Sequence, residues 1–243
     1  MSVITADQYS SRPYPGRRPA HSYLLDEDRV LAIGTAGSLP TWRLCDGRGQ
    51  TLVEWLATNE GHSIADRRPL LCYGSNACPG KLLELRHRFA LPGPVVMSRC
   101  DVVGFAAAWC NGRRSGGEQS IPATLVVAVG REQHFVWWVA PDQWEALDRC
   151  EGRWGGWYDV VRLGQRPDRA VLDERGEPIP GVLAYVGACP ERRSLLSKEG
   201  APLLVREHDQ AAAGRSLAES TPTTLQVSRH DMPVGAAYRG ERE

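Results

Sequence analysis

The chain has 243 residues, of which 42% are hydrophobic and 24% charged, and these values are ordinary for a globular protein. Its 29 basic and 29 acidic side chains give no formal net charge, which argues against a general attraction to nucleic acid or to an acidic membrane. The seven cysteines form no Cys-x-x-Cys pair and the apolar runs are too short to span a bilayer, so we expect a reduced cytoplasmic protein without a metal site.

The first quarter of the chain predicts an extension of the main domain. Residues 1–28 are polar and contain several prolines, which is typical of a flexible lead-in or of a strap over a surface. Residues 29–34 predict a short strand. Residues 51–57 predict a short helix, because Thr51 and Glu54 have the spacing of a capping box. We therefore expect an N-terminal extension over 1–66, partly flexible and packed on the core, then a main domain over 67–215 and a tail over 216–243.

Strand signals dominate the predicted main domain, because Val, Phe and Trp recur between clusters of turn-forming residues. A helix is predicted from about Pro79 to Phe89, where leucines repeat on one face, and a second helix is predicted to begin at Pro141. The expected strands cover residues 69–73, 94–97, 101–109, 123–129, 134–139, 158–163 and 182–186. The predicted fold class is α+β, a compact mixed, barrel-like sheet with a few flanking helices.

A tight corner, Gly74-Ser75-Asn76, follows the predicted strand that ends at Tyr73. Glycine takes backbone angles closed to other residues, and serine and asparagine are common turn formers. Successive N–H groups in such a turn, close to a helix start, can form a concave anion site. Taken alone, these residues favour an ordinary strand-to-helix turn.

A second motif surrounds Glu151, at the predicted end of the helix that begins at Pro141. Gly152 is placed to be its left-handed cap, and Trp154 and Trp157 follow. An acid among indole rings at a helix C-terminus has its charged form disfavoured, which suits a group that transfers protons near neutral pH. Taken alone, this motif favours the simpler interpretation that Glu151 is a solvated residue at a helix end.

Together these motifs resemble the gamma-glutamyl cyclotransferase family. The resemblance rests on Tyr73-Gly74-Ser75-Asn76, on Ala123-Thr124-Leu125, on Leu147-Asp148-x-x-Glu151-Gly152 with Tyr158 seven residues after the acid, and on Tyr185 in "LAYVG". Order and spacing agree over roughly residues 69–187, about half of the chain. The sequence departs from the family pattern in its long N-terminal segment and after Pro190, which affects the expected substrate more than the expected reaction.

The resemblance implies an enzyme that closes a γ-glutamyl amide into 5-oxoproline and releases an amine or amino acid, as in glutathione metabolism. It implies that Glu151 is the general acid and base. It implies that Gly74, Ser75 and Asn76 hold the glutamyl head group and that Tyr73, Tyr158 and Tyr185 complete the pocket. The implied partner is a small-molecule γ-glutamyl substrate, with no cofactor, metal, nucleic acid or membrane. The leaving amine and the oligomeric state stay open.

Two alternatives remain open at this point. One is a non-catalytic small-molecule binding protein of the same fold, although the retained Glu151 favours an enzyme. The other, which we rank lower, is a hydrolase with Ser75 or Cys78 as nucleophile, because no histidine stands in a recognisable pairing with either residue. Arg113 and Arg114 could reach a substrate carboxylate, but we expect both to be solvated.

Overall fold

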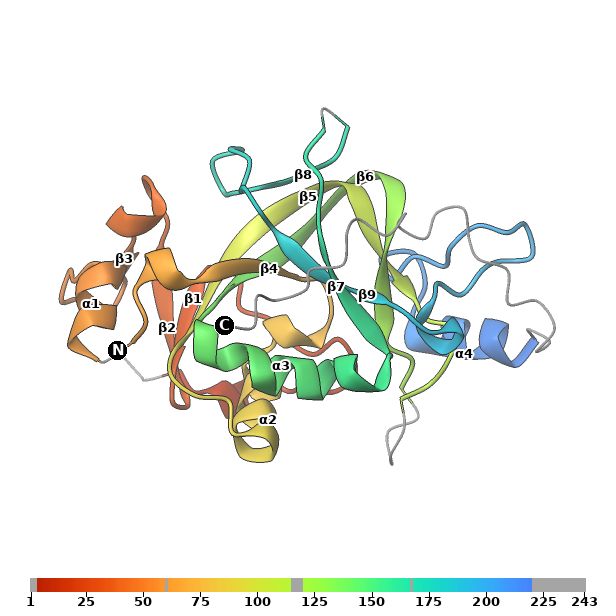
Figure 1. Cartoon of the computed structure of the whole chain (residues 1–243), viewed down its shortest axis with the longest axis horizontal. Coiled ribbons are helices and arrows are strands. Elements are labelled where there is room, and N and C mark those ends of the chain that lie inside the picture. Colours follow the sequence, from red (N-terminus) through yellow and green to blue (C-terminus); the bar gives the residue numbers. More distant parts are fainter. Residues whose placement is uncertain (1–3, 60, 115–119, 167, 220–243) are drawn as a thin grey trace.

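The computed structural model describes residues 4–59, 61–114, 120–166 and 168–219. In this part of the chain, nine strands form one mixed sheet in the order β3-β2-β1-β5-β6-β4-β9-β7, with β8 paired to β5 (Figure 1). Only the pair β4 and β9 is parallel among these strands. The strands are β1 Tyr23–Asp26, β2 Arg29–Gly34, β3 Arg43–Leu44, β4 Arg68–Cys72, β5 Val95–Trp109, β6 Ala123–Val139, β7 Tyr158–Arg162, β8 Ala170–Leu172 and β9 Leu183–Gly187.

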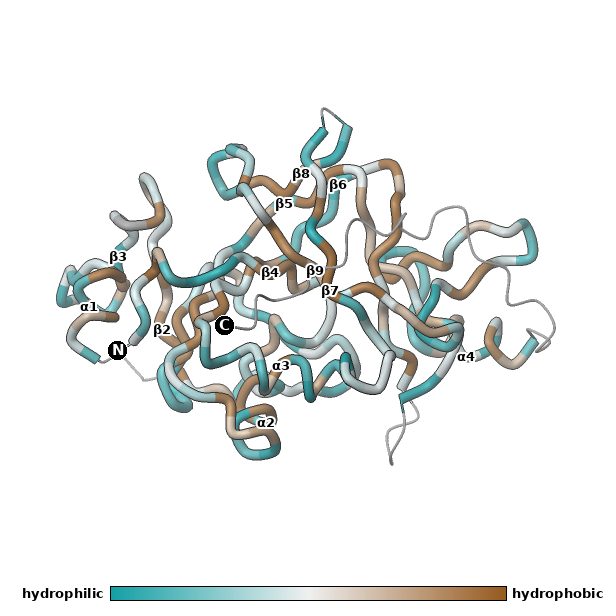
Figure 2. The backbone as a smooth tube through the Cα atoms, in the orientation of Figure 1, coloured by the Kyte–Doolittle hydropathy of each residue, from teal (hydrophilic) through white to brown (hydrophobic). Residues whose placement is uncertain are grey.

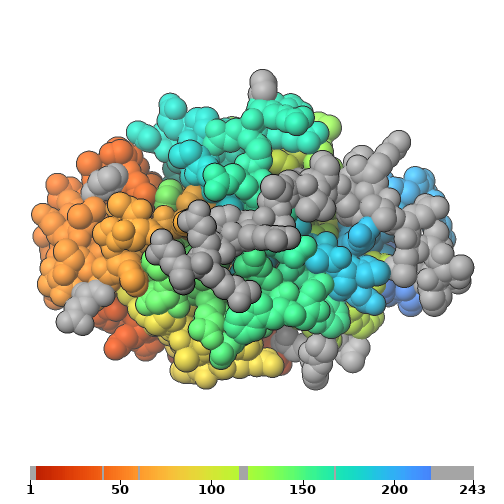
Figure 3. Space-filling model, viewed as in Figure 1, coloured from red at the N-terminus to blue at the C-terminus, as the bar shows by residue number. Residues whose placement is uncertain are grey.

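Four α-helices flank this sheet in the described chain, which confirms the predicted α+β class. They are α1 Leu52–Thr58, α2 Pro79–Phe89, α3 Trp144–Glu151 and α4 Gln210–Glu219. Helices α2 and α3 contact each other and cover the same side of the sheet (Figure 1). Helix α1 lies at one end of the long axis and α4 near the other (Figures 1 and 3).

Alternating residues of the strands divide the core between the two faces of the sheet. In β4, Leu70 and Cys72 pack with α2 and α3, whereas Leu71 packs with the cluster on the other face. This is the two-residue period of a strand that is buried on both sides. The strands accordingly carry much of the hydrophobic sequence (brown in Figure 2). Strand β4 therefore lies inside the molecule, and packing on both of its faces fixes the position of its C-terminal end.

Two long strands replace four that the sequence predicted. Strand β5 continues through residues 98–100 and β6 through 130–133, where polar residues suggested breaks. The register of this pair shifts between Val103 and Phe105, and Gly104 at the shift has φ +74°. A Cβ on Gly104 would lie 2.2 Å from the carbonyl oxygen of Asp168, so the strand stays continuous by accepting a bulge at a glycine.

The prediction of a polar lead-in over residues 1–28 is wrong for its last part. Residues 23–26 form β1, which pairs with both β2 and β5 in the middle of the sheet. Tyr23, Leu24 and Leu25 are all fully buried, but three apolar residues were too short a run to stand out in the sequence. Helix α4 was also not predicted. Residues 220–243 of the expected tail lie outside the described residues, and no described helix is long and apolar enough to cross a membrane.

A buried acid, Glu132, bridges β6 to the bulge of β5. Its carboxylate accepts hydrogen bonds from the N–H of Ala107 at 3.0 Å and from Nε2 of His134 at 2.8 Å, and an ion pair from Arg206 at 3.3 Å. Burial raises the pKa of Glu132, but the bonds from His134 and Ala107 outweigh it and leave the pKa below its ordinary value. Burial lowers the pKa of His134, more than the carboxylate raises it.

We expect this cluster to make the fold sensitive to acid. A lowered pKa of Glu132 contributes stability that is present above its unfolded value and is lost as pH falls through the folded value. The neutral form of His134 is favoured in the fold, so protonation below about pH 6.5 also favours unfolding. Glu132→Ala should lower the free energy of unfolding at pH 7 by roughly 2–4 kcal/mol. It should also make the decline between about pH 6.5 and pH 4.5 steeper, because the carboxylate no longer raises the pKa of the buried His134.

Urea unfolding at pH 7.0, 5.5 and 4.5 measures both effects. Glu207→Ala is the matched control, because Glu207 contacts the same arginine but is exposed. A Glu132→Ala protein as stable as the Glu207→Ala protein, with an unchanged pH dependence, would refute this assignment.

Candidate active site

The corner after β4 is built by three elements in succession. Strand β4 ends at Cys72, one residue before the predicted end, and a 3₁₀ turn spans Ser75–Ala77. Helix α2 begins at Pro79, as the sequence predicts. Pro79 suits a first helical position because a proline has no N–H to leave unpaired. The corner, residues 73–76, therefore lies between a buried strand and a helix that is packed on the same sheet.

In the described chain, the carbonyl groups of the corner up to Ser75 accept hydrogen bonds from the protein, whereas the N–H groups from Gly74 to Asn76 have no acceptor. Arg18 donates from Nη2 to the carbonyls of Tyr73 at 3.1 Å and Gly74 at 2.9 Å. The carbonyl of Ser75 accepts from the N–H of Cys78 at 2.9 Å. Within the described chain, no acceptor pairs with the N–H groups of Gly74 or of the two residues that follow it. A set of adjacent unpaired N–H groups suits an anion or a developing oxyanion.

Glu151 is brought to the corner by the end of α3. Gly152 caps the helix in the left-handed region, with φ +65°, which confirms the predicted cap. A Cβ on Gly152 would lie 2.8 Å from the ring of Trp157, so glycine is required there on steric grounds as well. Nδ2 of Asn76 donates to Oε1 of Glu151 at 2.8 Å. This hydrogen bond joins two motifs that are 75 residues apart in the sequence.

The three tyrosines named from the sequence use their hydroxyl groups within the protein. Tyr73 donates to the carbonyl of Tyr185 at 2.6 Å, Tyr185 to Oδ1 of Asp148 at 2.7 Å, and Tyr158 to the carbonyl of Ala123 at 3.0 Å. Burial raises the pKa of all three hydroxyls well above the ordinary value. They therefore stay neutral and serve as rigid walls rather than as acids or bases.

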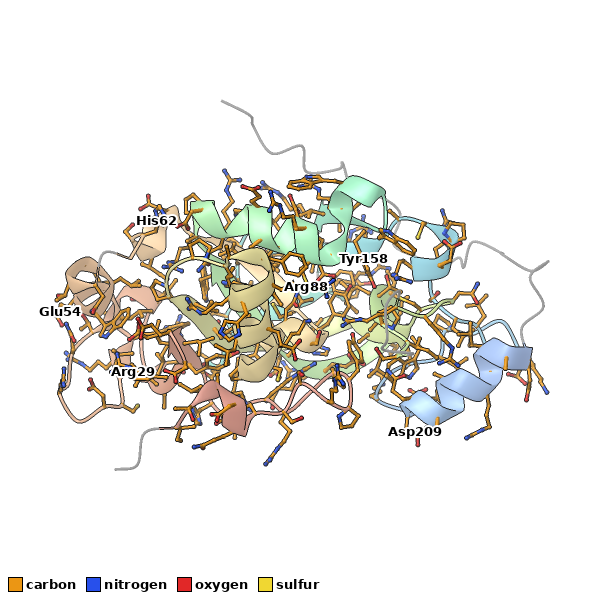
Figure 4. All side chains as sticks on the ribbon, turned by 90° about the horizontal axis from the view of Figure 1, so that it is seen from below. Arg29, Glu54, His62, Arg88, Tyr158 and Asp209 are labelled. Carbon is orange, nitrogen blue, oxygen red and sulfur yellow. The ribbon has the colours of Figure 1, made fainter. Side chains whose placement is uncertain are left out.

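One cavity is lined by all seven residues that the sequence singled out. The space among them is about 370 Å³, part of it open to solvent. It adjoins a wider groove of about 1580 Å³ along which both Arg88 of α2 and Tyr158 lie (Figure 4). The cavity is lined by Tyr73, Gly74, Ser75, Asn76, Glu151, Tyr158 and Tyr185, together with Tyr14, Leu71, Cys72, Arg114, Pro122 and Ala123.

Sequence reasoning missed part of this wall. Tyr14 and Arg18 belong to the N-terminal segment, and no motif marked them. The expectation that Arg114 is solvated is wrong, because its guanidinium lies over the ring of Tyr14 at 5.1 Å and its Nη2 is 3.4 Å from Oγ of Ser75. Trp154, which we expected beside Glu151, is 66% exposed.

The structure also bears on the alternative nucleophiles. Cys78 is buried outside the cavity with its Sγ 3.4 Å from the carbonyl of Tyr9, and burial raises the pKa of its thiol. Ser75 lines the cavity, but no histidine does so among the described residues. Among the described residues, therefore, Ser75 has no histidine beside it in the cavity, and the Cys78 thiol lies outside the cavity. In the same part of the chain, no group of three His, Cys, Asp or Glu side chains is placed to hold a metal ion.

Comparison with solved structures gives partial matches of low sequence identity. A chain described as gamma-glutamyl cyclotransferase matches with a TM-score of 0.38 and 21% identity over 49% of this chain and 66%, just under two thirds, of that chain. An uncharacterized protein from Homo sapiens matches with a TM-score of 0.40 and 21% sequence identity, over 51% of this chain and 68% of that chain. YkqA from Bacillus subtilis matches with a TM-score of 0.39 and 14% sequence identity, over 70% of this chain and 54% of that chain. No protein-family model and no curated protein matches the sequence.

Proposed function

We propose that the protein catalyses the intramolecular aminolysis of a γ-glutamyl amide, giving 5-oxoproline and a free amine or amino acid. The observation that carries this proposal is the hydrogen bond of 2.8 Å between Asn76 and Glu151. It puts a carboxylate next to a corner with unpaired N–H groups, inside one cavity whose wall also carries neutral tyrosine hydroxyls. A base beside an anion site is the pair of groups that acyl transfer needs.

The reaction balances without water or a further reactant. Glu151 accepts a proton from the α-ammonium group, and the freed α-amine attacks the γ-carbonyl carbon of the same molecule. The N–C bond of the five-membered lactam forms, and the N–H groups of the corner stabilise the oxyanion. Glu151 then gives its proton to the leaving nitrogen as the old C–N bond breaks, and it passes the excess proton of the ring nitrogen to the released amine, which leaves as an ammonium ion. Because nucleophile and electrophile belong to one molecule, the protein has mainly to orient them and to move two protons in succession between the two nitrogens.

Two features of the site would support these steps. Asn76 fixes Oε1 of Glu151 by its hydrogen bond and leaves the second carboxylate oxygen for the substrate. Arg18 holds two carbonyls of the corner, so the peptide groups present their N–H groups without rearrangement. The adjoining groove leaves room for a leaving group larger than the glutamyl head.

The test is turnover of a panel of γ-glutamyl compounds, namely γ-glutamyl amino acids, γ-glutamyl amines and glutathione, with both products identified by mass spectrometry. We expect at least one member to give 5-oxoproline and an equal amount of amine. Binding of a panel member without turnover would support the binding-protein alternative instead. The identity of the leaving amine stays open, and a place in glutathione metabolism and a cytoplasmic location stay predictions.

The proposed mechanism uses no thiol, so blocking accessible cysteines should leave turnover within about threefold of the untreated value. Cys78→Ser should behave in the same way, because the Cys78 thiol is buried and hydrogen-bonded outside the cavity. Turnover after alkylation and in the Cys78→Ser protein checks this. Loss of all activity in a Cys78→Ser protein that keeps its circular dichroism spectrum would instead support a thiol nucleophile.

A further inference from the structure

Tyr14 forms a fixed platform on one wall of the cavity. Its hydroxyl accepts the N–H of Ala123 at 3.1 Å, and its ring lies 5.8 Å from that of Trp109. It also lies against the corner, where a Cβ on Gly74 would be 2.7 Å from the Tyr14 hydroxyl. Glycine at position 74 therefore makes room for this platform. A side chain from the N-terminal segment is thus built into the wall of the site.

Arg114 lies on this platform as a cation without an acidic partner. Its contacts in the described chain are the ring of Tyr14 and the hydroxyl of Ser75, and no described carboxylate lies within ion-pair distance of it. Burial lowers the pKa of Arg114, but the charges of Tyr14 and Glu151 outweigh this and raise it, so the guanidinium stays charged. A partly buried cation is stabilised when an anion binds beside it.

Among the described residues that line the cavity, the charged side chains are one cation, Arg114, and one anion, Glu151. The α-carbon of a γ-glutamyl compound carries a carboxylate and an ammonium group, which is the complementary pair of charges. Glu151, as the base of the proposed reaction, takes the ammonium side. The planar guanidinium of Arg114 matches the two oxygens of a carboxylate.

We propose that Arg114, supported by Tyr14, binds the α-carboxylate of the glutamyl group and so selects substrates that carry it; this rests on the proposed function. Orienting the carboxylate fixes the α-amine on the Glu151 side and turns it toward the γ-carbonyl. Arg114 is then a specificity-determining residue. A substrate whose α-carboxylate is replaced by a carboxamide lacks the anion and loses this interaction.

The experiment compares binding of two small probes, 5-oxoproline and 5-oxoprolinamide, to the full-length protein by calorimetry or NMR titration. They differ only in a carboxylate against a neutral amide. Wild type should bind 5-oxoproline about 10- to 100-fold more tightly than 5-oxoprolinamide, the range expected for hydrogen bonds to a charged group. In Arg114→Gln this preference should fall to about threefold or less, and Arg114→Lys should retain part of it.

The controls separate this inference from the proposed reaction. Arg113→Gln, on the exposed neighbouring residue, should keep the preference of wild type. Melting curves of each variant report folding. No preference in wild type, or an unchanged preference in a folded Arg114→Gln or Arg114→Lys protein, overturns the role of Arg114 even if 5-oxoproline is still released. A carboxylate preference that depends on Arg114, in a protein that turns over no γ-glutamyl compound, upholds the binding role and refutes the reaction.

Discussion

Glu151→Gln is expected to lower turnover of a γ-glutamyl substrate by about two orders of magnitude or more, the usual contribution of a positioned acid–base group. Glutamine keeps the size of the side chain, and its amide oxygen still accepts the hydrogen bond that Asn76 donates to Oε1. It cannot accept the proton of the α-ammonium group. Substrate binding should therefore stay close to that of wild type while turnover falls, so the loss should be seen in kcat rather than in KM.

The matched control is Glu145→Gln, because Glu145 lies on the same helix, is exposed and forms a surface ion pair with Arg149. It should leave kcat within about twofold, as expected for an exposed pair. Release of 5-oxoproline by each protein, with circular dichroism as the folding check, gives the answer. If the Glu151→Gln protein is as fast as the Glu145→Gln protein, Glu151 is not the base.

Deleting residues 1–66 is expected to unfold the protein or make it insoluble. The deletion removes β1 and β2 from the sheet and exposes the edge of β5 over Val95–Met97, which pairs with β1. It also removes the fully buried side chains of Tyr23, Leu24 and Leu25. At about 1.5–3 kcal/mol for each buried side chain, this loss is comparable with the whole stability of a typical domain.

Point variants in the same segment test whether its buried side chains stabilise the fold. Leu24→Ala should lower the free energy of unfolding by about 3 kcal/mol, because it leaves a cavity between β1 and the cluster around α1. Val53→Ala, on the exposed side of α1, should change it by about 0.5 kcal/mol or less. Urea unfolding measures both. A soluble truncated protein with the melting temperature of the full chain would show that residues 1–66 are an independent appendage.

Local signals predicted the parts of the fold that depend on local physics. Helix α2 has the predicted limits because Pro79 suits a helix start and its leucines repeat on one face. The capping box of Thr51 and Glu54 is present, with Thr51 accepting the N–H of Glu54 at 3.2 Å and Glu54 accepting that of Thr51 at 2.8 Å. Each of these features involves residues within a few positions of one another, so a single sequence contains the information.

The parts that the sequence did not predict depend on contacts between distant segments. The run Tyr23–Asp26 is short, and only its place between β2 and β5 makes it a central strand. Tyr14 reaches the cavity because the N-terminal segment passes beside the corner. Arg114 follows polar and glycine residues that read as a solvated loop, and only the platform of Tyr14 shows where its side chain goes. The division into an extension, a main domain and a tail stays a prediction.

The most direct test of intramolecular aminolysis is the origin of the oxygen atoms in the product. Wild-type protein is incubated with a γ-glutamyl compound that it converts, in water enriched in ¹⁸O, and the glutamyl product is analysed by mass spectrometry. Intramolecular aminolysis uses no water, so we expect 5-oxoproline without ¹⁸O and one equivalent of free amine. Glutamate carrying ¹⁸O as the first product would show hydrolysis by a water molecule and would contradict the proposed intramolecular aminolysis.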